Sequence, residues 1–242
     1  MKILVTGSAG TVGRPVCQEL LRCGHEVRGF DRHPSHELID AVVADIADAA
    51  AVRAAVEGMD AVVHLAAQPV DAPFADLVGP NVVGLYNTFD ACREAGVKRL
   101  VLASSVMTVI RRPDRTHPAR VDEAWPGDHY ALTKLWAEQM GAMYARRFGM
   151  SILAVRIGWV VRNPDEARHM LKLGIFDIYL SRADVGRFFA AAVTAKGIDF
   201  EIAYAASRGG EKVFDMEPAR RLLGYEPKER WPEGLPFPLP EG

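Results

Sequence analysis

Cysteine is scarce in this sequence, and its few cysteines form no pattern. Cys17, Cys23 and Cys92 are the three cysteines among 242 residues, and no two of them make a CxxC pair. This spacing argues against a disulfide framework. Long apolar runs are missing as well: none approaches the roughly 18 residues of a membrane span, and the opening M-K-I-L-V-T-G is too short for a signal peptide. We therefore expect a cytoplasmic protein without a membrane partner.

A large charge of one sign is also missing. Lys and Arg number 29 and Asp and Glu number 31, so the formal net charge is −2. No electrostatic grip on nucleic acid is expected from that balance. The one basic stretch, residues 111–120, is interrupted by prolines, and we interpret it as a solvated loop; the alternative is a loop that contacts an anion beside an active site. The seven histidines show no spacing typical of metal ligands, so no metal site is predicted.

Short β-rich runs alternate with helical periodicities along most of the chain. Alternation of this kind implies right-handed crossovers and an α/β fold, a doubly wound parallel sheet with helices on both faces. No linker is long enough to divide the chain, so residues 1–242 are predicted to form a single domain. We expect strands at 3–6, 25–30, 41–45, 60–65, 98–105, 151–156 and 200–205, and helices at 11–22, 48–57, 76–95, 128–148, from the S-R-A-D at 181–184 onward, and at 216–223.

Three glycines follow the first predicted strand at regular spacing. Gly7, Gly10 and Gly13 stand between that strand and the first predicted helix. Glycines at such a turn permit close approach of the backbone to a phosphate, and the helix N-terminus favours the negative charge. A glycine triplet alone also occurs for packing, but its place in the first strand–helix unit predicts a Rossmann-type dinucleotide site.

Acidic residues after the next two strands extend this site. Asp31 ends the second predicted strand, where a carboxylate can hold the hydroxyls of the adenosine ribose, and Asp45 and Ile46 follow the third, where they could flank the adenine. The charge of Asp31 would repel the additional phosphate of NADP, so NAD is the predicted cofactor. Arg32 leaves NADP as the alternative, because an arginine could hold that phosphate.

A tyrosine and a lysine lie four residues apart in the helix predicted at 128–148. Tyr130 and Lys134 therefore share one helix face. A nearby ammonium group favours the phenolate and lowers the pKa of a tyrosine toward the working range of a general base. Ser104 and Ser105 end the fifth predicted strand at the cofactor edge of the sheet. Together these residues predict a catalytic constellation; the alternative is an amphipathic helix with an incidental Tyr and Lys.

Five motifs taken as a set resemble one protein family. They are T-G-x-x-G-x-x-G at 6–13, H-L-A-A at 64–67, S-S at 104–105, Y-x-x-x-K at 130–134 and R-I-G at 156–158. They are similar to motifs of the extended short-chain dehydrogenase/reductase family, also described as NAD-dependent epimerases and dehydratases, over about the first 160 residues. Within that family the sequence resembles NAD-dependent uronate dehydrogenases, through N-V-V-G-L-Y-N at 81–87, A-R-H-M-L at 167–171 and A-A-S-R at 205–208.

The resemblance implies a role for each catalytic residue. Tyr130 would remove the proton of the substrate hydroxyl, Lys134 would bind the nicotinamide ribose, and Ser105 would hydrogen-bond the reacting oxygen. Arg168 would match the arginine that pairs with a uronate carboxylate; the alternative is a surface arginine in the charged loop N-P-D-E-A-R at 163–168.

The resemblance also completes the predicted sites. It divides the chain into a Rossmann core at 1–158 and a small C-terminal substrate-binding segment at 159–242, and it implies a homodimer through the helices at 76–95 and 128–148. The further cofactor residues are Ala9, Thr11, Val12, Leu65, Ala66, Ala67, Asn81 and Ile157, and the further substrate residues are Gln68 and Val106.

Several positions depart from the uronate dehydrogenase pattern. Where S-S-N-H is expected the chain reads S-S-V-M, with Val106 and Met107, and expected serines are replaced by Pro69 and Trp159. A sugar leaves unpaired hydroxyls in such an apolar pocket. We therefore expect oxidation of a small sugar, sugar acid or polyol, with uronate itself open. A nucleotide-sugar epimerase or dehydratase and a non-catalytic NAD-binding regulator are the alternatives.

Overall fold

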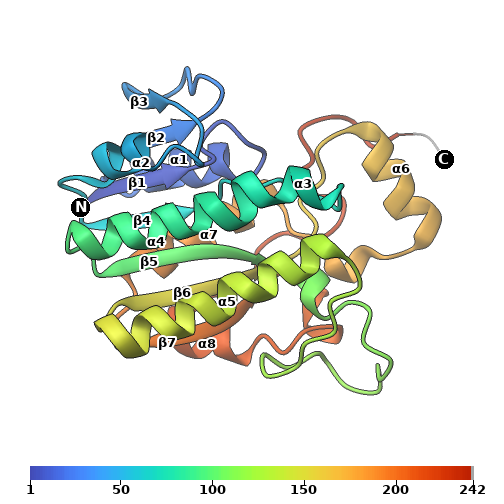
Figure 1. Ribbon diagram of the computed structural model, residues 1–242. Coiled ribbons are helices and arrows are strands. Elements are labelled where there is room, and N and C mark those ends of the chain that lie inside the picture. Colours follow the sequence, from blue (N-terminus) through green and yellow to red (C-terminus); the bar gives the residue numbers. More distant parts are fainter. Residues whose placement is uncertain (241–242) are drawn as a thin grey trace.

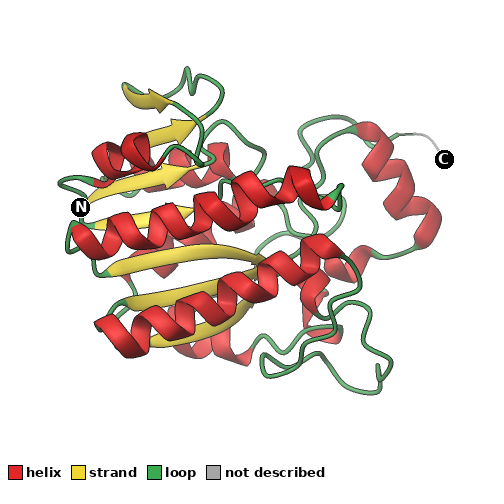
Figure 2. Ribbon diagram, viewed as in Figure 1, coloured by secondary structure: helices red, strands yellow, loops and turns green. Residues whose placement is uncertain are grey.

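The protein forms one sheet of seven parallel strands between two layers of helices (Figure 1, Figure 2). The computed structural model describes residues 1–240, so the last two residues of the predicted segment 159–242 lie outside the described residues. The strand order β3-β2-β1-β4-β5-β6-β7 reverses direction between β1 and β4, the point at which open α/β sheets bind ligands. The strands are β1 (Lys2–Thr6), β2 (Glu26–Asp31), β3 (Asp40–Val43), β4 (Ala61–His64), β5 (Arg99–Ser105), β6 (Ser151–Ile157) and β7 (Phe200–Ala205).

Each face of the sheet has its own hydrophobic core. Neighbouring residues of a strand point to opposite faces, so Ile3 packs in one core and Leu4 in the other. The first core lies under α1 (Gly13–Arg22), α7 (Arg182–Thr194) and α8 (Glu217–Leu223); the second lies under α2 (Ala49–Val56), α4 (Gly84–Glu94) and α5 (His129–Phe148), the helices in front in Figure 1. Both faces of the sheet are covered, which explains why its strands read as nearly continuous apolar runs.

The helix predicted at 76–95 is longer and less regular than its periodicity suggests. It begins as α3 (Phe74–Leu77), continues as a π-helical stretch, η1 (Val78–Val83), and becomes regular in α4. Pro80 lies inside the π-helical stretch, where its missing N–H makes the regular hydrogen-bond ladder impossible. Single-turn 3₁₀ helices also occur at η2 (Val106–Thr108), η3 (Phe176–Ile178) and η4 (Gly210–Lys212).

The predicted doubly wound fold is confirmed, and one helix is added to it. The structure has α6 (Pro164–Leu173) where the sequence analysis allows a charged loop. Asn163 caps this helix by accepting a hydrogen bond from the Glu166 N–H at 3.0 Å, Pro164 occupies the first turn, and Gly174 ends the helix in the left-handed conformation. Asparagine, proline and glycine at these positions are ordinary helix boundary signals, so the helix could have been predicted from them.

The C-terminal segment is fastened to the core by a buried carboxylate. Asp184 is fully buried and accepts backbone N–H groups of Lys228 at 2.9 Å and Glu229 at 3.1 Å. Beyond this point, Trp231 and Phe237 pack with residues of α6 in a small third core. Residues 159–240 thus contribute both to the main sheet, through α7 and β7, and to a separate layer at the carboxyl ends of the strands, through α6. Among residues 1–240, no helix combines the length and the apolar character needed to cross a membrane.

Candidate active site

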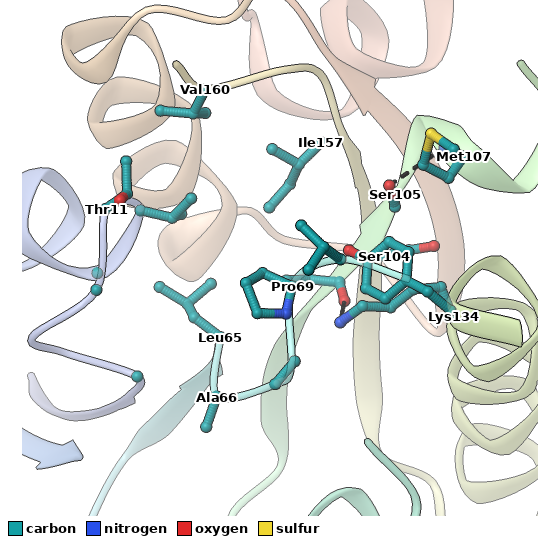
Figure 3. A pocket seen from close by; sticks show the side chains of 18 of the residues that line it. Thr11, Leu65, Ala66, Pro69, Ser104, Ser105, Met107, Lys134, Ile157 and Val160 are labelled. Carbon is teal, nitrogen blue, oxygen red and sulfur yellow. Dashed lines mark hydrogen bonds between the residues drawn. The ribbon is translucent and has the colours of Figure 1, made fainter. Parts of the chain in front are cut away.

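A cavity of about 610 Å³ opens at the carboxyl ends of the strands, where the sheet order reverses (Figure 3). The loops after β1, β2, β4, β5 and β6 all contribute residues to it. Parallel strands bring their carboxyl ends to one edge, which is why motifs far apart in the sequence meet there. The cavity joins the glycine-rich turn at one end to Tyr130 and α6 at the other.

Two positions of the glycine-rich turn leave no room for a side chain. Gly7 has a φ of +74°, and a Cβ on it would lie 2.8 Å from the Ala66 nitrogen. A Cβ on Gly13 would lie 2.0 Å from the Gly7 carbonyl oxygen, inside the close contact between the turn and α1. The exposed backbone and the helix N-terminus together fit the pyrophosphate of a dinucleotide.

Asp31 lies at the end of β2, beside this turn and on the cavity wall. Its carboxylate accepts the Ala9 N–H at 3.1 Å and the His33 N–H at 2.9 Å, so it shapes the turn as well as facing the cavity. Arg32 lines the same end of the cavity. The residues present therefore fit an adenosine ribose at Asp31, with Arg32 as a neighbouring cation.

Replacing Asp31 with Ala should weaken NAD binding by roughly 10- to 100-fold, the loss expected when a charged hydrogen-bond acceptor is removed. The preference for NAD over NADP should narrow, because the carboxylate no longer repels an additional phosphate. Titration of both reduced cofactors by nicotinamide fluorescence measures the two dissociation constants. An Arg32→Ala control should leave NAD binding nearly unchanged. A wild-type preference for NADP that disappears in Arg32→Ala would show that the arginine controls this end of the site.

The structure brings most of the predicted cofactor residues to the cavity wall. They are Gly7, Gly10, Thr11, Val12, Gly13, Asp31, Arg32, Ile46, Leu65, Ala66, Ala67, Tyr130, Lys134 and Ile157. Within the described part of the chain, Ala9, Asp45 and Asn81 are outside this lining. Asp45 accepts the Ala47 N–H at 2.8 Å in a local turn. Asn81 is buried behind the wall and ties two elements together, accepting the Gln68 N–H at 2.7 Å and donating to Thr133 Oγ1 at 3.1 Å.

Tyr130, Lys134 and Ser105 meet at the centre of the cavity. The first two turns of α5 present Tyr130 and Lys134 to it, and the last residue of β5 is Ser105. Lys134 Nζ donates to the Ala103 carbonyl oxygen at 3.0 Å and lies 5.7 Å from the centre of the Tyr130 ring. All three side chains are at least nine-tenths buried, so a hydroxyl held between them would be largely shielded from water.

Burial controls the titration of this group. It raises the pKa of Tyr130 to about 12, although a hydrogen bond with Ser105 acts in the opposite direction. Burial also lowers the pKa of Lys134 to about 8. The expectation that Lys134 lowers the tyrosine pKa is therefore not met in this structure, where desolvation of the phenolate outweighs every neighbouring charge.

The substrate end of the cavity lacks two of the residues predicted to bind the substrate. Ser105 and Val106 line it as predicted, but within residues 1–240 the lining includes neither Gln68 nor Arg168. The Arg168 side chain is 57% exposed and pairs with Asp165 on the outer side of α6. His169, the next residue, turns into the cavity instead.

The sequence analysis names none of three basic side chains at the cavity as a site residue. Arg111, Arg162 and His169 all line it. Arg111 belongs to the basic stretch interpreted as a solvated loop, so part of that stretch reaches the site. Neighbouring residues of a helix point about 100° apart, so Arg168 and His169 cannot both face the cavity. The sequence does not show which of them does, because this depends on how α6 is rotated about its axis in the structure.

Comparison with known proteins identifies the family of this chain. Residues 3–182 match the model of the NAD dependent epimerase/dehydratase family. The chain is 30% identical to uronate dehydrogenase of Pseudomonas putida, covering 94% of this chain and 84% of that one. It is 32% identical to L-arabinose 1-dehydrogenase (NAD(P)(+)) of Haloferax volcanii, covering 94% and 96%. A variant of uronate dehydrogenase from Agrobacterium tumefaciens, solved as a complex with NAD, superposes with a TM-score of 0.83 at 30% identity, covering 99% and 91%.

The fold, the cavity and the similarity to known dehydrogenases together identify the class of enzyme. The glycine-rich turn and Asp31 fit NAD, and the relatives of comparable length are dehydrogenases, among them an NAD-dependent glucose-6-phosphate dehydrogenase of Haloferax volcanii. The protein is an NAD-dependent oxidoreductase, and it belongs to the NAD-dependent epimerase/dehydratase family.

Proposed function

We propose that the protein oxidises a hydroxyl group of a small sugar, sugar acid or polyol, with Tyr130 as the general base. The observation that carries this proposal is the convergence of Tyr130, Lys134 and Ser105 on the cavity that begins at the glycine-rich turn. A non-catalytic regulator that binds NAD needs no buried base at this position. The uronate and arabinose dehydrogenases to which the chain is similar support a sugar substrate.

Each side chain has a distinct task in this reaction. Ser105 Oγ, which accepts the Met107 N–H at 3.2 Å, is held where it can hydrogen-bond the reacting oxygen. Tyr130 removes the proton of the substrate hydroxyl, and the buried ammonium of Lys134 lies beside it. NAD held by the glycine-rich turn and Asp31 would supply the acceptor for the hydride that leaves the substrate carbon. The apolar wall formed by Val106, Ile157 and Val160 excludes water from the reacting carbon.

The size of the cavity favours a small substrate over a nucleotide-linked sugar. About 610 Å³ must hold the cofactor as well as the substrate. Trp159 and Met107 occupy part of the substrate end, so it is narrow and partly apolar. We therefore infer a single sugar ring or a short polyol as the substrate.

A spectrophotometric screen tests the proposed function. Aldoses, uronates, sugar phosphates, polyols and UDP-sugars are each offered with NAD, and absorbance of the reduced nicotinamide is followed. Oxidation of at least one small sugar, sugar acid or polyol supports the proposal. Turnover or tight binding confined to UDP-sugars would overturn the substrate class, and NAD binding without turnover of any compound would favour a regulator.

We further propose that the protein is a homodimer through α4 and α5. Large apolar side chains are exposed on these two adjacent helices, among them Tyr86 at 51%, Leu132 at 52% and Trp136 at 45%. Apolar side chains gathered in this way on a surface commonly mark an interface.

Light scattering should accordingly give a mass near twice the 26.5 kDa of one chain. Trp136→Lys should shift the protein toward the monomer, because a charge is then buried in the interface. Leu21→Lys, at a residue 44% exposed on α1, is the matched control and should remain dimeric. A monomeric wild type at micromolar concentration would rule the dimer out.

A cytoplasmic location is proposed on the state of the thiols. Cys17, Cys23 and Cys92 are free, and two of them are buried. Free cysteines suit a reducing compartment, where disulfides do not persist. Fractionation of cells that express the protein tests this location.

A further inference from the structure

We propose that Arg162 recognises an anionic group on the substrate, so that the site prefers a sugar bearing a carboxylate or a phosphate. This inference rests on the proposed function and names the substrate class more closely. Arg162 lies after β6, lines the substrate end of the cavity, and is close enough to the Tyr130 hydroxyl for its charge to favour the phenolate. A group bound by Arg162 would therefore lie near the carbon that is oxidised.

Glu166 holds the Arg162 side chain in place. Its Oε1 accepts Arg162 Nε at 2.5 Å and also faces Nη2, while its Oε2 accepts the Arg162 backbone N–H at 2.9 Å. Trp159 Nε1 donates to the same Oε2 at 3.2 Å. Both oxygens of the Glu166 carboxylate thus accept hydrogen bonds from Arg162, and one of them also holds the indole of Trp159. An arginine fixed in this way loses little side-chain entropy when it binds a ligand.

One edge of the Arg162 guanidinium remains for a ligand. Nε and Nη2 face Glu166, whereas Nη1 donates no hydrogen bond to any residue in the described range 1–240. The side chain is 40% exposed, so a ligand in the cavity can reach this edge. A guanidinium edge is well suited to a carboxylate or phosphate oxygen.

A carboxylate in the cavity lining also caps a helix. Asp128 also lines the cavity, and its charge acts on Tyr130 against that of Arg162. Its carboxylate, however, caps α5 by accepting the Ala131 N–H at 2.7 Å. Arg111 adds a second guanidinium at the same cavity, and Asp71 adds a second carboxylate. Among these groups, Arg162 is the cation that hydrogen bonds hold in place, and its Nη1 is the donor left for an anion.

Kinetics on matched substrates test this inference. Glucose, glucuronate and glucose 6-phosphate share a sugar ring and differ in whether a carboxylate, a phosphate or neither is present. In Arg162→Met, KM for the preferred acidic sugar should rise roughly 10- to 100-fold, the loss expected for charge-assisted hydrogen bonds. KM for glucose should stay within about threefold. Which of the two acids loses more identifies carboxylate or phosphate as the natural group.

Two variants keep the test decisive. Arg168→Met removes the same charge from an exposed position outside the cavity and should leave every KM near the wild-type value. Arg162→Lys keeps a positive charge and should therefore retain part of the affinity for the acidic sugar. The affinity should stay below that of the wild type, because lysine cannot bind an anion in the bidentate geometry of arginine. Equal increases of KM for acidic and neutral sugars, or an equal effect of Arg168→Met, would overturn the inference.

A binding experiment separates this inference from the proposed function. Calorimetric titration of glucuronate and glucose 6-phosphate into the protein loaded with NADH needs no turnover. Weaker binding in Arg162→Met than in the wild type supports the inference even if none of the three sugars is oxidised. If the wild type oxidises only neutral sugars and binds neither acid, the proposed function stands and the role of Arg162 is refuted.

Discussion

Tyr130→Phe should lower turnover by roughly 10²- to 10⁴-fold, the usual contribution of a positioned acid–base group. The change removes one hydroxyl from a residue that is 8% exposed, so the shape of the cavity is kept. NAD affinity should stay nearly intact, because Asp31 and the glycine-rich turn remain. Steady-state kinetics with the best substrate and fluorescence titration of NADH measure the two effects separately.

The pH dependence supplies a second measure of the same residue. Burial raises the pKa of Tyr130, so the phenol is largely protonated at neutral pH and the phenolate fraction increases as the pH rises. Oxidation by the wild type should therefore accelerate with pH above neutrality. The residual activity of Tyr130→Phe should lack this increase. Tyr144→Phe is the matched control, since Tyr144 lies on the same helix but packs between Phe89 and Phe148. Near-wild-type turnover in Tyr130→Phe would exclude the tyrosine as the base.

The sequence predicts those features that depend on local pattern. Gly13 is required by a contact within the glycine-rich turn, and Gly7 by its positive φ and by the close approach of Ala66. The short apolar runs become strands because both faces of the sheet are buried. Alternating strands and helices also predict right-handed crossovers and a parallel sheet, and the cavity lies at the carboxyl ends of its strands. The order of the strands is seen only in the structure. The division of the chain at residue 158 stays a prediction, although β7 and α7 share the main sheet and core with residues before it.

The sequence does not predict features that depend on helix register or on desolvation. Arg168 and His169 are neighbours in the chain, yet only the packing of α6 on the C-terminal segment turns His169 toward the cavity. Arg162 is held in place by hydrogen bonds to Glu166, and the spacing of these residues in the sequence does not indicate them. The pKa of Tyr130 depends on how deeply the phenol is buried, and this outweighs the charge pattern visible in the sequence.

A buried ion pair lies directly beneath the catalytic residues. Glu138, one turn after Lys134 on α5, is fully buried, and its two oxygens accept Arg156 Nε at 2.8 Å and Nη2 at 2.9 Å. Ser104, the neighbour of Ser105, donates to the same carboxylate at 2.5 Å. Arg156 Nη1 donates to the Tyr204 hydroxyl at 2.8 Å. Burial favours the neutral guanidine, but the hydrogen bond and charge of Glu138 outweigh it and raise the pKa of Arg156.

Glu138→Gln should lower the free energy of unfolding by about 3–5 kcal/mol, because it leaves the Arg156 charge buried without its counter-ion. Urea unfolding at pH 7 measures the change. Glu217→Gln, which removes an exposed carboxylate paired with Arg221, should have little effect. Arg156→Met alone leaves the Glu138 carboxylate buried without its counter-ion. In the Glu138→Gln background that carboxylate is already gone, so Arg156→Met should there lower the free energy of unfolding by less. Additive costs would show that the two side chains stabilise the fold separately and that the ion pair does not join α5 to β6.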